Sequence, residues 1–404
     1  MFQSLAFWGL VPLFAGANAR LSPKARALMI TALSLGLILA LNPMTGAWLA
    51  AEVVAVWMVL GAAARTTGTA KTALLWTGIT LIIANLVAFK YLPTGEIGAV
   101  LTAQGGLAKD VVDWLVQIGF PLGISFLSFR MIHILVECMR GTLPKLSTSD
   151  YFLYAFFFPI WIAGPIERVD RFFAGRADKV SSDDLTIGAN RVFWGLVKVF
   201  FLSKAVLPAL YAASFTPDSI APNMAQLGVA DTWWYLLVTY AILYTDFSGY
   251  SDLAIGLSRL FGFKIVENFN FPFLATNMSD YWRRWHISLA NWCQSYVYMP
   301  VLARTRRPNL ALYCSFFVMG LWHAASPNWI LWGMWHATGV TLYRLYDRFR
   351  RKNLAFINTA HWGVALFNNL LTIAYASGAG AFTSLHGKAP IAASFSLLGK
   401  AIGL

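Results

Sequence analysis

Three of the six histidines are the residues of this sequence best suited to chemistry. His286, His323 and His336 lie in or beside apolar segments, where an ionisable side chain is costly and usually serves a function. A neutral imidazole can accept a proton from a hydroxyl group, which is general-base catalysis. His323 ends one apolar segment, and His336 lies about 10 Å into the next if that segment is helical. We therefore predict His323 as the base and His336 as a residue that supports it.

Tryptophan and acidic residues near these histidines are further candidates. Trp285 and Trp322 each directly precede one of the histidines, although tryptophans at such places commonly pack against other helices or lie at a membrane interface. Asp246 ends an apolar segment, where bonding to the backbone or to Arg283 and Arg284 is an equal alternative to a catalytic role. We keep Trp285, Trp322 and Asp246 as supporting site residues.

Two other kinds of site have little support in the sequence. Ser326 lies close to His323, but the sequence lacks the G-x-S-x-G turn of many serine hydrolases. The histidines show no H-E-x-x-H or comparable metal-binding spacing. The three cysteines, Cys138, Cys293 and Cys314, have no C-x-x-C spacing. We expect neither a bound metal ion nor a resident cofactor.

The composition places these residues in a membrane protein. Of the 404 residues, 58% are hydrophobic and only 12% are charged, and the mean hydropathy is +0.59. A soluble domain carries about 25% charged residues. The net charge of +13 is typical of cytoplasmic loops that face anionic lipid, so we do not expect nucleic-acid binding.

The elements that must position the site are membrane-spanning helices. A helix needs about 20 mainly apolar residues to cross the hydrocarbon. We expect an all-α, polytopic fold with no domain boundary, so that residues 1–404 form one membrane domain. The eleven candidate spans are 2–16, 27–41, 47–63, 72–89, 112–136, 192–213, 233–249, 311–323, 329–345, 356–375 and 391–404.

Basic residues predict the orientation of these spans. Arg20, Lys24 and Arg26 follow the first apolar segment and place that loop in the cytoplasm, with the N-terminus outside. No basic residue precedes this segment, so we expect a retained helix rather than a cleaved signal peptide. Alternation then places the C-terminus inside, His286 on the cytoplasmic side and His323 near the outside.

Two apolar segments are predicted to be re-entrant or interfacial, because crossing the membrane would violate the charge pattern. The first is 151–165. The second is 278–299, which we expect to form one helix with His286 on its apolar face. That face comprises Trp282, Trp285, His286, Leu289, Trp292, Cys293 and Tyr296.

Long sequence runs resemble the membrane-bound O-acyltransferase family. They are DFSGYSDLAIGLSRLFGFKIVENFNFPFLATNMSDYWRRWHISLANW (246–292) and GLWHAASPNWILWGMWHATG (320–339). The runs GISFLSFRMIHILVECMRG and FFFPIWIAGPIERVDRF are similar to the same branch. That bacterial branch includes the membrane subunits of alginate O-acetylation and teichoic-acid D-alanylation, and the resemblance covers about 123–339.

The resemblance implies spans and thin re-entrant segments around a funnel that opens outward and a narrow channel to the cytoplasm. It also implies that His323 corresponds to the family's invariant histidine, His286 to the histidine of the RRWH motif and His336 to that of the WGxxH motif. The branch usually has glycine where this chain has Ala324 and Ala337. A methyl group at each site would narrow the funnel, which puts the size of the acceptor in question.

The resulting hypothesis is an O-acyltransferase of the bacterial cytoplasmic (inner) membrane. It would pass an acyl group, acetyl in first place, from a cytoplasmic acyl-CoA or acyl-carrier thioester to hydroxyls of an extracytoplasmic polysaccharide. A secreted or periplasmic acyltransferase partner is expected, besides membrane lipid. Transfer of D-alanine to teichoic acid is the alternative. A transporter of lipid-linked sugars or acyl carriers, or a scaffold for a secreted complex, belongs to a different class, and the sequence lacks the paired repeats of many transporters.

Overall fold

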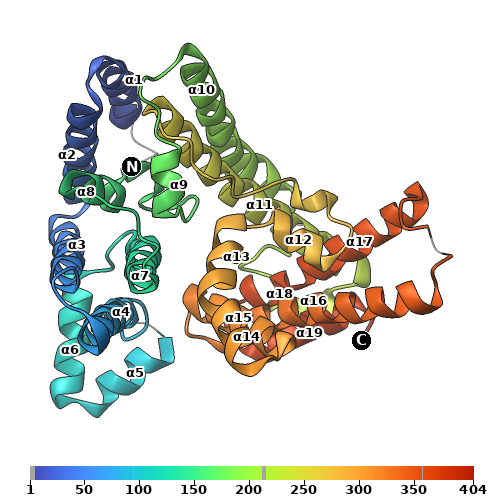
Figure 1. Ribbon diagram of the computed structural model, residues 1–404. Helices are drawn as coiled ribbons and strands as arrows, with labels where there is room; N and C mark the ends of the chain where they lie inside the picture. Colours follow the sequence, from blue (N-terminus) through green and yellow to red (C-terminus); the bar gives the residue numbers. More distant parts are fainter. Residues whose placement is uncertain (1–4, 94, 212–214, 357) are drawn as a thin grey trace. The chain divides into compact units, whose positions relative to one another are not determined.

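The protein is helical throughout the part that the computed structural model describes, residues 5–93, 95–211, 215–356 and 358–404 (Figure 1). No strand occurs within those ranges, where one isolated bridge joins Arg176 to Phe263. The predicted all-α fold is therefore confirmed. Small parts of three predicted spans, residues 2–4, 212–213 and 357, lie outside the described residues.

The chain divides into two compact units, and every candidate site residue belongs to the second. The first unit comprises Met1–Phe193 and Asp252–Val266, and the second comprises Trp194–Ser251 and Glu267–Leu404. The single domain over 1–404 stays a prediction. The site can be described within the second unit alone.

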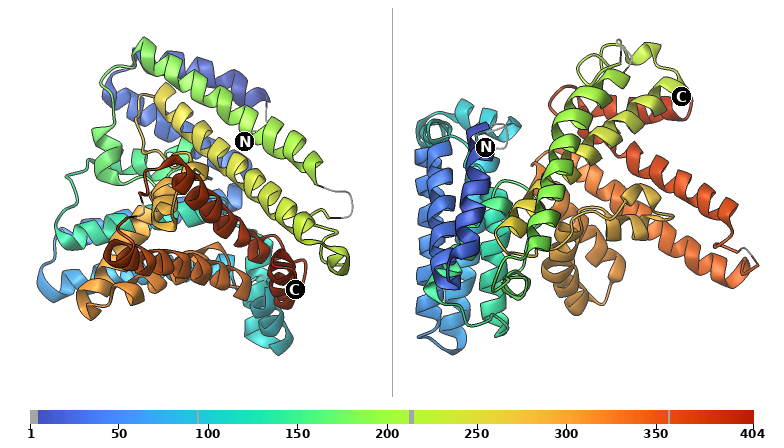
Figure 2. Two further views of the ribbon diagram at one scale, coloured as in Figure 1. Left: turned by 90° about the vertical axis from the view of Figure 1, so that its right-hand side faces the viewer. Right: turned by 90° about the horizontal axis from the view of Figure 1, so that it is seen from above.

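The first unit begins with four consecutive helices, α1 (Leu5–Arg20), α2 (Pro23–Leu41), α3 (Pro43–Ala63) and α4 (Gly68–Lys90). Proline begins both α2 and α3, where its missing N–H is not needed. The preceding side chains, Ser22 and Asn42, accept hydrogen bonds from Ala25 N (3.4 Å) and Thr45 N (3.1 Å) and so cap the two helices. Helices α2, α3 and α4 lie side by side, as the blue ribbons of Figure 2 show.

Among the residues that the structure describes, four helical stretches are long and apolar enough to cross a membrane. They are Pro23–Leu41, Pro43–Ala63, Gly68–Lys90 and Ser182–Leu210. The last is continuous, because α10 (Ser182–Leu196) runs into the π-helix η2 (Val197–Val206) and the 3₁₀ turn η3 (Leu207–Leu210). All four overlap predicted spans, and the total of eleven stays a prediction.

The predicted span 112–136 is wrong, because the chain breaks in its middle. Helix α6 (Gly106–Ile118) ends before Gly119, and α7 (Ile124–Arg140) begins after Gly123. Both glycines have positive φ, 84° and 92°, which other residues rarely adopt. A Cβ on Gly123 would lie 2.6 Å from Nε1 of Trp161, so only glycine fits this close approach. A further helix, α5 (Gly95–Gln104), precedes α6 between the predicted spans 72–89 and 112–136.

The apolar segment 151–165 forms short pieces and no long helix. These pieces are α8 (Thr148–Phe156) and the 3₁₀ turn η1 (Phe158–Ile160), and α9 (Val169–Ala174) follows. Trp161 and the aromatic residues of the two pieces are buried, except for Phe152, which is partly exposed. A segment this broken is too short to span a bilayer as one helix, which agrees with its predicted exclusion from the spans.

The second unit contains most of α11 (Val229–Leu260), after the short turn η4 (Met224–Gln226). This helix has 32 residues and is much longer than the predicted 233–249. The remaining elements are η5 (Pro272–Leu274), α12 (Met278–Arg284), α13 (Ile287–Cys293), the π-helix η6 (Gln294–Tyr298), α14 (Met299–Thr305), α15 (Pro308–His323), α16 (Pro327–Asn353), α17 (Trp362–Gly378), α18 (Gly380–Thr383) and α19 (Ile391–Ala401).

The prediction of one helix over 278–299 is wrong. Helix α12 ends at Arg284, and His286 adopts the left-handed conformation with φ 43° before α13 begins. Left-handed φ is uncommon for residues other than glycine, so surrounding contacts must hold it. The helical periodicity of the aromatic residues therefore runs across a break in the backbone.

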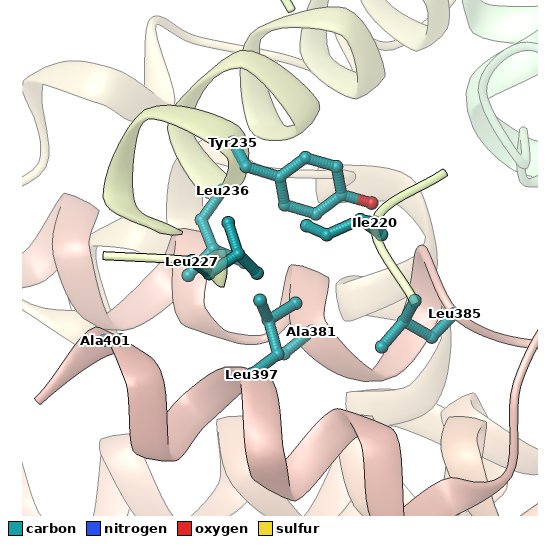
Figure 3. Packing of buried hydrophobic residues seen from close by; sticks show 8 residues of the cluster. All are labelled: Ile220, Leu227, Tyr235, Leu236, Ala381, Leu385, Leu397 and Ala401. Atoms are coloured by element: carbon teal, nitrogen blue, oxygen red, sulfur yellow. The ribbon is translucent and has the colours of Figure 1, made fainter. Parts of the chain in front are cut away.

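A hydrophobic cluster joins the C-terminal helices to the start of α11 (Figure 3). Tyr235 and Leu236 of α11 pack there with Leu385, which follows α18, and Leu397 of α19. All four side chains are at most 1% exposed. The cluster fixes the position of the turn between α18 and α19, which lies near the site.

Candidate functional site

The hairpin of α15 and α16 is built on two glycines. A Cβ on Gly320 would lie 2.3 Å from the carbonyl oxygen of Trp329, and one on Gly333 would lie 2.3 Å from that of Phe316. The helices therefore pack backbone against backbone, as small residues allow in membrane proteins. This close packing brings the end of α15, where His323 lies, against the first turn of α16.

His323 is enclosed by three indole rings. Its ring stacks on Trp329 with centroids 4.3 Å apart and planes at 16°. Trp322 lies edge-on at 4.6 Å and Trp332 at 5.2 Å. The side chain is half-buried. The three indoles thus hold the His323 ring in one orientation without burying it completely.

His336 lies one layer deeper in α16 and is almost fully buried. Its ring contacts Trp332 at 4.9 Å, Trp282 at 5.1 Å and Tyr281 at 6.1 Å. Because Trp332 contacts both His336 and His323, the predicted support of one histidine by the other would act through this indole. Nδ1 of His336 is buried without a hydrogen-bond partner within the described residues.

His286 is held in its left-handed conformation by Asn268. The Asn268 side chain accepts hydrogen bonds from Ser288 N (3.3 Å) and Ser288 Oγ (2.8 Å), and its backbone oxygen accepts one from Ile287 N (3.0 Å). Asn268 Nδ2 in turn donates to Ser251 Oγ (3.1 Å). These bonds fix the backbone on both sides of the turn.

The His286 ring is buried in an aromatic environment. It lies 4.6 Å from Phe247, edge-on, and 6.3 Å from Trp322. Burial lowers the pKa of His286 to about 3, so the ring is neutral at neutral pH. Trp322 lies between His286 and His323, since its ring contacts both.

Trp285 packs in the same aromatic cluster. Its ring stacks on Tyr281 and Tyr240, each at 5.7 Å, and meets Phe269 edge-on at 5.2 Å. A small cavity of about 40 Å³ is lined by Trp285, Tyr240, Tyr281, Trp332 and His336, among others. Trp285 therefore packs against other aromatic residues, which is the alternative to a direct role in the site.

Asp246 lies next to the site without forming the arginine contacts considered for it. It accepts a hydrogen bond from Ser203 Oγ of η2 at 3.1 Å. Arg283 and Arg284 instead pair with Asp280, at 3.4 and 2.8 Å. The next residue, Phe247, contacts His286, whereas the Asp246 side chain bonds to η2.

A larger pocket of about 510 Å³ lies next to two aromatic rings that contact His336. Trp282 and Phe316 line it, and both rings also contact His336. Arg283 and Arg344 line the same pocket and give it a positive charge. Chemically, the pocket suits an anionic ligand with an apolar part. Across the described ranges, no group of three or more His, Cys, Asp or Glu side chains could hold a metal ion.

Sequence reasoning missed several of these residues. Asn268 gave no signal as the support of His286, because the two are 18 residues apart in a segment without regular periodicity. His386 is 60 residues from Ser326, yet its Nδ1 lies 3.3 Å from Ser326 Oγ. Pairs of this kind depend on the folding of separate segments and leave no spacing pattern.

Comparisons with known proteins match the region that contains this site. The sequence model of the membrane-bound O-acyltransferase family matches residues 73–386. The chain is 34% identical over 271 residues, 64% of this chain and 49% of the relative, to a probable alginate O-acetylase of Pseudomonas syringae pv. tomato.

Two further relatives have other named acceptors. The chain is 30% identical over 253 residues, 57% of this chain and 60% of the relative, to a teichoic acid D-alanyltransferase of Bacillus subtilis. It is 35% identical over 262 residues, 57% of this chain and 49% of the relative, to a peptidoglycan O-acetyltransferase of Helicobacter pylori. The chain spans about half the length of the curated relatives it matches.

Proposed function

Because this chain belongs to the membrane-bound O-acyltransferase family, we propose that it transfers an acyl group, acetyl in first place, from a thioester donor to hydroxyl groups of a cell-envelope polysaccharide. The observation that carries this proposal is the half-buried ring of His323, stacked on Trp329 inside the region that matches the family. The names of the relatives support polysaccharide, teichoic acid and peptidoglycan as acceptor classes.

In this proposal His323 is the general base. Its neutral imidazole takes the proton of the acceptor hydroxyl as the oxygen attacks the acyl carbon, and the thiol of the donor leaves. General-base assistance of this kind is worth about 10²–10⁴ in rate. The imidazolium that forms lies against the face of Trp329, where a cation–π interaction stabilises the positive charge.

The donor side of the proposal is the positive pocket of about 510 Å³. Acyl-CoA and an acyl-loaded carrier protein both bear phosphate next to an apolar arm, and Arg283 and Arg344 offer the complementary charge. From that pocket, Trp282 and Phe316 contact His336, which contacts Trp332, which contacts His323. His286, Trp285 and Trp322 support this path from the RRWH side.

The direction of transfer and the location follow from the charge pattern and stay part of the proposal. The donor would come from the cytoplasm and the acceptor from outside, in a bacterial inner membrane with the N-terminus outside and the C-terminus inside. A secreted or periplasmic acyltransferase partner would complete the modification of the polysaccharide. Transfer of D-alanine is the second candidate, which similarity to the D-alanyltransferase supports.

A radiolabel assay tests the proposal and separates its two variants. Membrane vesicles containing the chain receive either acetyl-labelled acetyl-CoA or a D-alanyl carrier protein, together with purified polysaccharide or teichoic acid. We expect label on the acceptor with acetyl-CoA. Label from the D-alanyl carrier alone would mean that the transferred group is D-alanyl and not acetyl. Label from neither donor, with movement of the lipid-linked sugar across the vesicle, would contradict acyl transfer and favour a transporter.

A further inference from the structure

A serine and a histidine that are 60 residues apart in the sequence meet beside His323. Ser326 Oγ lies 3.3 Å from Nδ1 of His386. The ring of His386 lies edge-on to Trp329 at 6.3 Å, and the same indole stacks on His323 at 4.3 Å. Trp329 therefore contacts two histidines, and a hydroxyl group accompanies one of them.

The Ser326 side chain does not cap the helix that it precedes. It is the N-cap residue of α16, where a serine hydroxyl usually accepts a hydrogen bond from a backbone N–H of the first turn. Here no such capping bond forms, and the hydroxyl lies against His386 instead. Ser326, His386 and Trp329 are all partly exposed, so the pair is not sealed inside the core.

Both halves of the pair are held in place by buried contacts. Asn328, in the first turn of α16, donates hydrogen bonds to Phe382 O (2.9 Å) and Ser394 Oγ (3.4 Å). Leu385, the residue before His386, is buried in the hydrophobic cluster of Figure 3. Lys388, two residues after it, also forms an ion pair with Asp218 at 2.7 Å, but this pair is exposed and contributes little. The Ser326 and His386 side chains therefore meet through a fixed arrangement of two segments.

We propose that Ser326, activated by His386, is a nucleophile that carries the acyl group as an ester between donor and acceptor. The proposal rests on the acyl transfer proposed above and divides it into two steps. A hydroxyl next to an imidazole is the usual arrangement of an activated serine, and a covalent intermediate splits one difficult transfer into two easier ones. A covalent intermediate also suits a reaction in which donor and acceptor arrive from different sides of the membrane.

The bonds balance in both steps. In the first, Ser326 Oγ attacks the thioester carbonyl, a C–O bond forms and the C–S bond breaks. His386 takes the serine proton and gives it to the departing thiol. In the second, the acceptor oxygen attacks the ester carbonyl, a new C–O bond forms and the bond to Ser326 Oγ breaks. His323 takes the proton of the acceptor hydroxyl, and Ser326 leaves with that proton.

The test is to look for the ester on the full chain. Purified protein is incubated with labelled acetyl-CoA in the absence of acceptor, denatured, and mapped by peptide mass spectrometry. We expect one acetyl group on Ser326, which disappears when polysaccharide is added. The variant H323A should accumulate this label, because its second step is slow. S326A should carry none, and H386A should form it about 10²–10⁴ times more slowly.

Matched controls separate chemistry from folding. Ser396 on α19 and His361 before α17 are exposed residues away from the pair, and S396A and H361A should label and transfer as the unmodified chain does. If S326A transfers acetyl at the unmodified rate, and neither S326A nor the unmodified chain carries label, Ser326 is not a nucleophile. Direct transfer with His323 as the base would then remain. Loss of both label and product in the unmodified chain would instead contradict the acyltransferase proposal itself.

Discussion

The imidazole of His323 stacks on the indole of Trp329, with ring centroids 4.3 Å apart and planes 16° from parallel. One residue ends α15 and the other lies in the first turn of α16, and the close packing of these helices at Gly320 creates the contact. The stack holds the ring in one orientation and offers a π-face to the charge that appears on protonation. In the proposed reaction, fixing the base in this way lowers the entropic cost of reaching the transition state.

The first prediction concerns this stack. W329A should lower the rate of acyl transfer about tenfold, because it removes a cation–π contact worth about 1 kcal/mol and frees the His323 ring. W329F keeps an aromatic face and should retain more of the rate. The rate of labelled acetyl transfer in vesicles measures both. W362A, at an exposed tryptophan of α17, is the control, and an equal loss in W362A and W329A would contradict the role of the stack.

A second prediction concerns the glycine that makes the hairpin close. G320A places a methyl group against the carbonyl oxygen of Trp329 and should destabilise the protein by about 1–3 kcal/mol, because the helices must move apart. The expected observation is a lower Tm in detergent together with reduced transfer. G61A lies in α3 with open space around its Cβ and should leave Tm unchanged or slightly raised. An unchanged Tm for G320A would show that the contact is not needed.

The third prediction concerns pH and His286. Burial lowers its pKa to about 3, whereas an unfolded chain has a histidine pKa of about 6.5. The folded state therefore holds fewer protons here, and the stability gained from a neutral His286 is complete above about pH 6.5 and is lost progressively as the pH falls toward 3.

H286N tests this linkage, because asparagine tolerates the left-handed backbone at this position and does not titrate. Tm is measured for both proteins between pH 7.5 and about pH 5. We expect the Tm of the unmodified chain to fall faster on acidification than that of H286N. Parallel curves would mean that His286 is not the group that couples stability to pH.

A fourth prediction separates donor binding from chemistry. R283A and R344A remove positive charge from the pocket of about 510 Å³ and should raise the KM for acetyl-CoA severalfold while kcat changes little. The effect should shrink as salt is added, because salt screens charge. Arg348 is an exposed arginine of α16, the helix that carries Arg344, but it does not line this pocket. R348A should therefore leave KM unchanged. A fall in kcat at constant KM would contradict a donor-binding role.

The sequence was sufficient for the fold class, for physical reasons. Apolar composition indicates that lipid is the solvent, and in lipid the chain must form helices or a closed barrel, so the all-α membrane fold could be predicted. The orientation that the basic loops indicate stays a prediction. His323 and His336 stand out because histidine is rare inside apolar helices. The predicted spans 27–41 and 47–63 lie inside α2 and α3, which begin four residues earlier, at Pro23 and Pro43.

The sequence was insufficient where the backbone departs from regular periodicity. The break at Gly119–Gly123 and the left-handed His286 both interrupt patterns that look continuous in the sequence. The contact between Ser326 and His386 depends on the packing of α16 against the α18 region, and no local pattern encodes it. Local sequence patterns do not predict long-range contacts of this kind.

The rate of acetyl transfer by H323A tests the central claim most directly. Vesicles containing H323A, H361A or the unmodified chain in equal amounts receive labelled acetyl-CoA and polysaccharide, and the initial rate of acceptor labelling is compared. If His323 is the base, H323A should be slower by about 10²–10⁴ with an unchanged Tm, while H361A matches the unmodified chain. Transfer by H323A at the unmodified rate would contradict the account.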